Sequence, residues 1–294
     1  MSAGSETSLG AARRDGLAAA QRFRLPFGGQ RWRGAAGGWQ GAGEGSSIDF
    51  HDHRAYAPGD DPRHLHWAAY ARTGQLTMKL YRAEVAPRVD LLVDASASMR
   101  AEPARAARTE SLVAFCLASA ARAGAPVRVQ AVTGRRVQAL AEERVRAEGF
   151  WAAVGAPDAG VGAVAPEGLQ GRTGAMKIWI SDLLYPGEPG SVLRGLAAGG
   201  GCVLVLVPVL AGEAELRERG NMELVDREGG AARHLRVDDG MAERYRAAYA
   251  RHFNLWRETA RRMAVGWARV DSSGTLASAL AGEARLGGVV EVVT

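Results

Sequence analysis

The feature that most constrains this chain is an apolar segment, Val89–Asp94, that ends in a carboxylate and is followed by two serines, Ser96 and Ser98. A strand covered on both faces of a parallel sheet has such a run of aliphatic residues. The loop leaving that strand is where open α/β sheets bind ligands, and oxygen donors are what Mg²⁺ prefers. The pattern predicts a metal site. Its alternative is a helix N-cap formed by Asp94 or one of the serines.

A second apolar segment, residues 177–184, carries Ser181 and Asp182 at its end. Parallel neighbours place their carboxyl ends at one edge of a sheet, so we expect Asp182 close to Asp94, as a ligand that acts through water. The alternative is an ion pair between Asp182 and one of the many arginines. Two such strand ends favour the metal site over capping.

Alternating helical and extended patterns predict an α/β domain with a mostly parallel sheet. Helices are expected at 103–123, 142–154, 191–198, 240–263 and 276–280, and strands at 75–85, 89–94, 127–133, 177–184, 202–209 and 267–271. Two further short strands around the turn at Glu228 predict a small hairpin inserted at about 218–238.

The upstream segment contains a turn cluster, residues 58–62, whose aspartates are expected to cap a short helix carrying Leu65 and Trp67. In the structural interpretation, charged side chains form a network that holds the segment against the sheet, and Tyr56 and Trp67 pack. In the functional interpretation the same side chains face a partner protein, because arginine and tryptophan are favoured interface anchors. The polar residues concerned are Arg54, Asp60, Asp61, Arg63 and Arg72.

These two patterns carry a resemblance that spans about Ser47 to Leu280. The loop of Asp94, Ser96 and Ser98 resembles the metal-ion-dependent adhesion site of von Willebrand factor A-like domains. The upstream segment resembles the signature of the bacterial family called domain of unknown function 58, in which it precedes an A-like domain. That signature corresponds here to Arg54, Tyr56, Gly59, Asp60, Asp61, Arg63, Trp67 and Arg72.

The resemblance implies a von Willebrand A-like, Rossmann-like fold, in which a mostly parallel sheet is flanked by helices. It also implies a non-enzymatic adaptor that binds Mg²⁺ or Mn²⁺ through Asp94, Ser96, Ser98 and Asp182. The resemblance further implies pairing with a bacterial MoxR-type AAA+ ATPase, which such an adaptor helps to act on client proteins during assembly or stress. A complete site also takes a threonine from a loop. The corresponding residues 155–166 contain none, so Asp158 is the candidate substitute and the site is expected to be degenerate.

A metal-dependent phosphohydrolase with Asp94 as the reacting carboxylate is the alternative function. Enzymes of the haloacid dehalogenase type place an aspartate two residues after that carboxylate, and this chain has Ser96 there. The sequence also contains no Gly-x-Ser-x-Gly elbow and no Walker-type phosphate loop. These observations favour the adaptor.

Composition bounds the remaining functions. The net charge is +5, but the arginines are spread along the chain near glutamates, so no nucleic-acid partner is expected. Cys116 and Cys202 lie in apolar runs and are expected to be buried core residues. No apolar stretch reaches the roughly twenty residues of a membrane-spanning helix and no signal-peptide core is present, so we expect the cytoplasm. The expected organisation is a flexible tail (1–45), in which residues 9–23 are a candidate short helix, a signature segment with a strand (46–87) and an A-like domain (88–294).

Overall fold

The computed structural model describes residues 3–27, 50–58, 60–81, 87–155, 169–185, 187–226, 228 and 230–293. The chain divides into two compact units. Unit 1 combines Met1–Ala35 with Pro87–Thr294, and unit 2 is Ala36–Ala86. The residues at the start of the chain therefore belong to the same unit as the predicted α/β domain.

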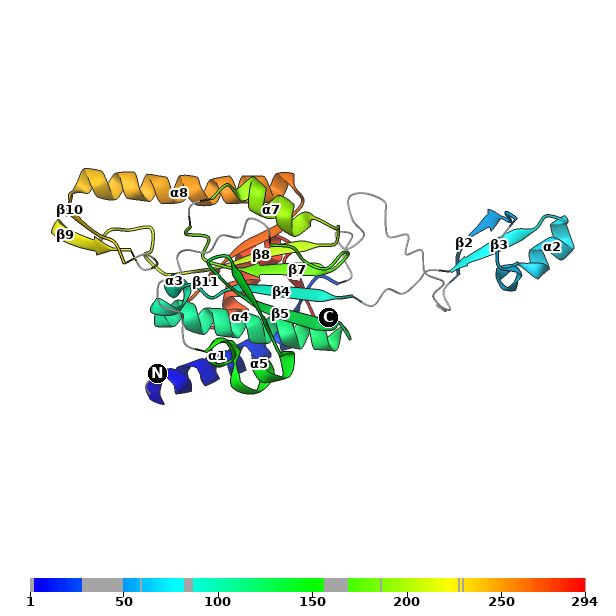
Figure 1. Ribbon diagram of the computed structural model, residues 1–294, viewed down its shortest axis with the longest axis horizontal. Helices are drawn as coiled ribbons and strands as arrows, with labels where there is room; N and C mark the ends of the chain where they lie inside the picture. Colours follow the sequence, from blue (N-terminus) through cyan, green and yellow to red (C-terminus); the bar gives the residue numbers. More distant parts are fainter. Residues whose placement is uncertain are drawn as a thin grey trace. The chain divides into compact units, whose positions relative to one another are not determined.

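A six-stranded sheet forms the centre of unit 1 (Figure 1). Its strands are β4 (Val89–Asp94), β5 (Val127–Thr133), β6 (Arg136–Leu140), β7 (Met176–Ile180), β8 (Val203–Val209) and β11 (Gly266–Asp271). The order is β11-β8-β7-β4-β5-β6, and every pair is parallel except β5 with β6. The predicted mixed α/β fold with a mostly parallel sheet is confirmed. The antiparallel edge strand β6 was missed, because its partly exposed residues do not form an apolar run.

Helices cover both faces of this sheet, with α4 on one face and α7 and α8 on the other (Figure 1). The helices of unit 1 are α1 (Ala3–Arg22), α3 (Ala97–Ala101), α4 (Pro103–Arg122), α5 (Glu142–Glu148), α6 (Phe150–Val154), α7 (Pro189–Ala197), α8 (Asp239–Arg262), α9 (Leu276–Ala279) and the π-helical turn η3 (Leu280–Ala284). Leu91 and Val93 of β4 pack in the cluster that contains α4, whereas Leu92 packs in the cluster with α7 and α8. The strand is thus buried on both faces, as its aliphatic run predicts.

The expectation of a flexible tail is wrong for residues 3–27. Helix α1 packs along α4, and Phe23 and Leu25 after it are buried. The two-residue strand β1 (Phe23–Arg24) pairs with β12 (Glu291–Val292) near the end of the chain. A composition rich in Gly, Ala and Arg is typical of a flexible tail, but small residues also let two helices pack closely. Residues 28–45 of the expected tail lie outside the described residues.

The predicted hairpin is present in unit 1. Strands β9 (Gly220–Val225) and β10 (Ala232–Val237) pair antiparallel and lie beside the start of α8 (Figure 1). Asp238 is the N-cap of α8, and its side chain accepts a hydrogen bond from the Met241 N–H at 2.7 Å. The polar side-chain cap fixes where the hairpin ends and the long helix starts.

Unit 2 consists of β2 (Phe50–Ala55), η2 (Pro62–His64), α2 (Trp67–Thr73) and β3 (Thr77–Tyr81). Strands β2 and β3 pair antiparallel, which confirms the strand predicted before the α/β domain. Asp61 is the N-cap of η2 and accepts a hydrogen bond from the Arg63 N–H at 2.9 Å, so the predicted aspartate cap is present. The expectation that the capped helix carries Leu65 and Trp67 is wrong, because Leu65 follows η2 and Trp67 begins α2.

Two further predictions concern the cysteines and membrane-spanning helices. Cys116 and Cys202 are both buried, as expected for core residues. Among the described residues, no helix combines the length and the apolar character that crossing a bilayer requires.

Candidate functional site

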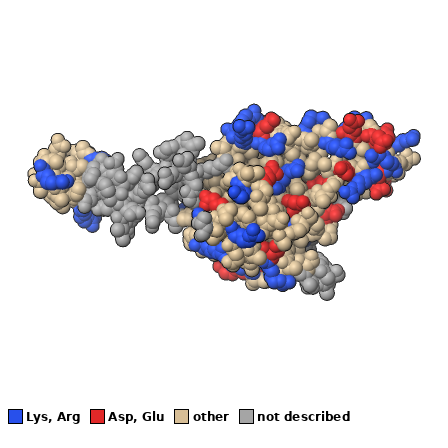
Figure 2. All heavy atoms as spheres, turned by 180° about the vertical axis from the view of Figure 1, so that it is seen from behind, with Lys and Arg blue, Asp and Glu red and all other residues tan. Residues whose placement is uncertain are grey.

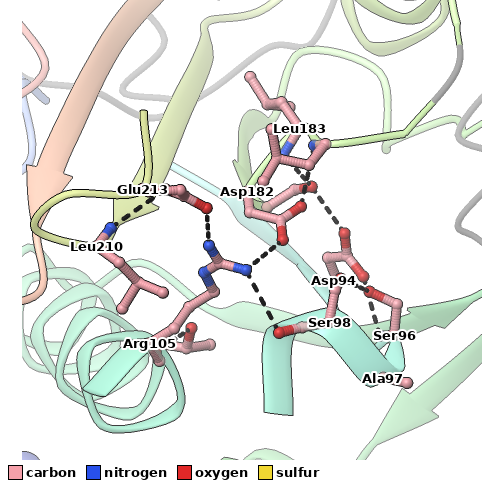
Figure 3. Close-up of polar contacts among 12 residues, drawn as sticks. Asp94, Ser96, Ala97, Ser98, Arg105, Asp182, Leu183, Leu210 and Glu213 are labelled. Carbon is pink, nitrogen blue, oxygen red and sulfur yellow. Dashed lines mark hydrogen bonds and ion pairs between the residues drawn. The ribbon is translucent and has the colours of Figure 1, made fainter. Parts of the chain in front are cut away.

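The ends of β4 and β7 bring the predicted site residues to one edge of the sheet (Figure 3). Val93 pairs with Ile180, so Asp94 at the end of β4 lies next to Ser181 and Asp182 after β7. The prediction that these two strands are parallel neighbours is confirmed. The site is therefore built from two loops that are far apart in the sequence.

Asp94 is a buried carboxylate that accepts two hydrogen bonds. It is 1% exposed. Its Oδ1 atom accepts from the Ser96 N–H at 2.9 Å, and its Oδ2 atom accepts from the Ser181 hydroxyl at 2.7 Å. Among the described lysines and arginines, none forms an ion pair with it. Burial, together with the negative charge of Asp182, raises the pKa of Asp94 to about 7.

The two loop serines do not act as helix caps. Ser96 precedes α3, but its side chain makes no capping hydrogen bond. Its Oγ atom lies 3.2 Å from the Oγ atom of Ser98. Instead, the N–H groups that start α3 donate to the carboxylate of Glu228 in the hairpin turn. The distances are 2.8 Å from Ser98 N and 3.3 Å from Ala97 N. The capping alternative therefore does not account for the two hydroxyls.

Asp182 forms the ion pair that was the alternative to a ligand role. Its Oδ2 atom lies 2.8 Å from the Arg105 guanidinium, and both side chains are buried. Arg105 also pairs with Glu213 and donates to the Ser98 carbonyl at 3.4 Å (Figure 3). A role for Asp182 as a water-mediated ligand stays a prediction.

Sequence reasoning missed three charged residues of this site, Arg105, Glu213 and Glu228. None carries a local signal, because each reaches the two strand ends from another element. Glu213 is also bound by α8, whose Tyr249 hydroxyl donates to its carboxylate at 3.2 Å. The aromatic stripe of α8 was predicted to be core, but the hydroxyl of Tyr245, another residue of the stripe, also donates to Glu213, at its carbonyl oxygen.

The backbone after Asp182 is strained. Leu183 has a φ of 59°, an uncommon conformation for a residue with a side chain. Its N–H donates to the Ser181 Oγ atom at 3.0 Å, and its carbonyl lies 2.8 Å from the Nε2 atom of His252. These contacts hold the loop in a conformation that keeps the Ser181 hydroxyl against Asp94.

The oxygen set fits a hard cation in part. At Mg–O distances of about 2.1 Å, neighbouring ligands of an octahedral ion are about 3 Å apart, which matches the separation of the two serine Oγ atoms. Four carboxylates lie at or beside the loop, and the Arg105 guanidinium pairs with two of them, so negative charge is in excess among these groups. Among the described residues, however, no three His, Cys, Asp or Glu side chains gather as a metal-binding group. A cation here would depend on serine oxygens and water. The four carboxylates at or beside the loop are Asp94, Asp182, Glu213 and Glu228.

Other predicted site residues lie elsewhere. Asp158, the candidate substitute for the threonine, lies outside the described residues, as does Gly59 of the signature. In unit 2, Arg54 pairs with Asp60 at 2.5 Å and Arg63 pairs with Asp61 at 2.6 Å.

The expected packing role of Trp67 is wrong. Its side chain is 59% exposed, and it forms an edge-to-face pair with Tyr70. Tyr56 is half-buried, and its N–H donates to the Leu76 carbonyl at 3.0 Å. Among the described contacts, Arg72 forms no ion pair, whereas Arg54 and Arg63 each pair with an aspartate of the turn cluster.

Charges on unit 1 are mixed. On the face seen in Figure 2, Lys and Arg alternate with Asp and Glu and form no continuous basic patch. This arrangement agrees with the distribution of arginines in the sequence. The absence of a nucleic-acid partner stays a prediction.

Comparisons with known proteins give a family match for part of the chain and several similar proteins. A family model described as "Protein of unknown function DUF58" matches residues 52–148. The chain is 30% identical over 215 residues to uncharacterized proteins of Mycobacterium bovis and Mycobacterium tuberculosis, and the match covers 68% of this chain and 67% of theirs. A crystal structure of the conserved hypothetical protein BatB from Bacteroides thetaiotaomicron covers 68% of this chain and 98% of that chain, with 16% identity and a TM-score of 0.38.

Proposed function

Because this chain belongs to the DUF58 family, we propose that it is a non-enzymatic adaptor of the von Willebrand A-like type that binds another protein through the loop of Asp94, Ser96 and Ser98. The loop holds Mg²⁺ or Mn²⁺ in a degenerate adhesion-type site. The observation that carries the proposal is the buried Asp94 carboxylate, which lies beside two serine hydroxyls and has no cationic partner among the described residues.

The chemistry of the loop supports a cation. A buried carboxylate without a compensating charge is costly, and its raised pKa reflects that cost. A divalent ion would offset the charge and use the two serine oxygens as neutral ligands. Mg²⁺ keeps several waters in such sites, and a partner carboxylate can replace one of them.

The same contacts disfavour the phosphohydrolase. Enzymes of the haloacid dehalogenase type place a second aspartate two residues after the reacting carboxylate, whereas Ser96 stands there and lies 3.2 Å from the Ser98 Oγ atom. Ser96 is also a poor substitute for a catalytic aspartate, because a hydroxyl does not exchange protons readily near neutral pH. Binding is the activity that these residues support best.

The partner class rests on the resemblance to the family. We propose a MoxR-type AAA+ ATPase, with client proteins as the further binding partners, in the cytoplasm. Unit 2 offers a second contact surface, since Trp67 and Tyr70 are both exposed there. Exposed aromatic residues of this kind are frequent anchors of protein interfaces.

Titration calorimetry with Mg²⁺ and Mn²⁺ tests the proposal. We expect the wild type to bind either ion and Asp94→Ala to show no binding. Asp271→Ala is the matched control, because Asp271 also ends a strand of the same sheet and is followed by serines, but lies on β11. Its binding should equal that of the wild type.

A double variant, Ser96→Ala with Ser98→Ala, separates the ligand role from folding. Neither hydroxyl is part of the hydrophobic core, so the melting temperature should change little while the affinity for Mg²⁺ falls. Equal affinity in the wild type, Asp94→Ala and the double variant would contradict the proposed site.

A further inference from the structure

The turn of the β9–β10 hairpin reaches the Asp94 loop through one side chain. The Glu228 carboxylate accepts from the Ser98 N–H with one oxygen and from the Ala97 N–H with the other. These N–H groups lie in the first turn of α3, where a helix provides no internal acceptor. A carboxylate from a distant part of the chain therefore covers the loop beside the two serine hydroxyls.

In the part of this hairpin that the structure describes, few contacts join the two strands to the rest of unit 1. Its two strands contact mainly each other, and Val237 is the buried residue among the strand positions that the structure describes. Leu224 and Leu235 are exposed. An isolated two-stranded hairpin is marginally stable in water, so its position over the loop depends on few contacts. The Glu228 carboxylate supplies charge-assisted hydrogen bonds to the loop.

We propose that Glu228 is a built-in competitor that occupies the Asp94 loop in place of a partner's carboxylate. The inference rests on the proposed function and adds its regulation: a partner binds only after the hairpin turn has left the loop. The partner's anchor is then an Asp or Glu side chain, because it replaces a carboxylate on the same face of the loop. The hairpin acts as an autoinhibitory latch.

A different role for Glu228 would be that of a permanent metal ligand in place of the missing threonine. Two observations favour the latch. Both Glu228 oxygens are directed at backbone N–H groups, and among the described residues no three acidic or histidine side chains gather within metal-binding distance. The two roles predict opposite effects of removing the carboxylate, so one pair of variants separates them.

The first measurement is amide hydrogen exchange by NMR in the metal-free protein. In Glu228→Ala we expect the Ala97 and Ser98 amides to exchange about tenfold faster, since each loses a hydrogen bond to a charged acceptor. Glu223→Ala is the matched control, because it removes an exposed glutamate from strand β9 of the same hairpin. Unchanged exchange in Glu228→Ala would overturn the latch, whether or not the loop binds metal.

The second measurement titrates acetate, a simple carboxylate probe, into the protein in the presence of Mg²⁺. The Ser98 amide resonance should report binding in Glu228→Ala at concentrations about tenfold lower than in the wild type and Glu223→Ala. Loss of Mg²⁺ binding in Glu228→Ala alone would overturn the latch, because Glu228 would then be a metal ligand. If the wild type binds no Mg²⁺, the proposed metal site fails, and the exchange result alone decides the latch.

Discussion

At the scale of single residues, Asp94 determines how a cation competes with protons. Its pKa is raised to about 7, and a metal binds only the ionised carboxylate. Below pH 7 most of the metal-free protein therefore carries a proton at this position. The affinity for Mg²⁺ should rise with pH and level off above about pH 8.

We predict that Mg²⁺ binds about tenfold more weakly at pH 6 than at pH 8, which is the ratio that a pKa near 7 gives for the ionised fraction. Titration calorimetry across this range measures the effect, and Asp271→Ala is expected to follow the wild-type profile. Equal affinity at pH 6 and pH 8 would contradict the assignment of Asp94 as the main charged ligand.

Arg105 stabilises the region around the Asp94 loop through two ion pairs. It is buried and pairs with both Asp182 and Glu213, so removing it leaves two carboxylates without a cation. We predict that Arg105→Met lowers the free energy of unfolding by about 3–5 kcal/mol, as measured by urea denaturation. Arg144→Met, which breaks the exposed pair with Glu148, should cost at most about 0.5 kcal/mol. Similar losses in both variants would show that the Arg105 network is not a buried unit.

At the scale of elements, the contact between α1 and α4 depends on a glycine. A Cβ atom at Gly16 would lie 2.2 Å from the Ser111 carbonyl oxygen and 2.9 Å from the Ala114 Cβ. At Gly10, in the same helix, the nearest atom would be the Arg14 side chain at 3.8 Å. Both positions are glycines within the helix, but only Gly10 has room for a Cβ atom.

We predict opposite effects of the same substitution at these positions. Gly10→Ala should stabilise the protein by up to about 1 kcal/mol through helix propensity. Gly16→Ala should destabilise it by about 1–3 kcal/mol, because α1 has to move away from α4. Thermal or urea unfolding compares the two variants with the wild type. Stabilisation by Gly16→Ala would contradict the close packing of α1.

At the scale of the whole molecule, the two units differ in how much core they contain. Both hydrophobic clusters consist of residues from unit 1. In the described part of unit 2, Leu65 and Met78 are the buried apolar residues. The folding of unit 1 should therefore be independent of unit 2.

We predict that replacing Ala36–Ala86 with a Gly/Ser segment of equal length leaves cooperative thermal unfolding intact. The melting temperature should stay within about 4 °C of the wild type, since no cluster residue is removed. Loss of the cooperative transition would mean that unit 1 needs unit 2 to fold.

Much of the fold follows from local patterns that the sequence carries by itself. The aliphatic runs of β4, β7 and β8 predict buried parallel strands, and the aromatic stripe of α8 predicts a long helix against the sheet. The order of Asp94, Ser96 and Ser98 after such a strand also predicts where the candidate site lies. These features are predictable because periodicity and strand ends are properties of a few consecutive residues.

Tertiary structure alone decided which groups complete the site and the core. Helix α1 became part of unit 1 because small residues such as Gly16 fit against α4, a fit that composition does not reveal. Asp182 pairs with Arg105, and the N–H groups at the start of α3 donate to the carboxylate of Glu228, although neither pair of partners is close in sequence. The physical reason is that hydrogen bonds and ion pairs depend on distance in space. Residues with ordinary local signals acquire a role only when the folded chain brings them together.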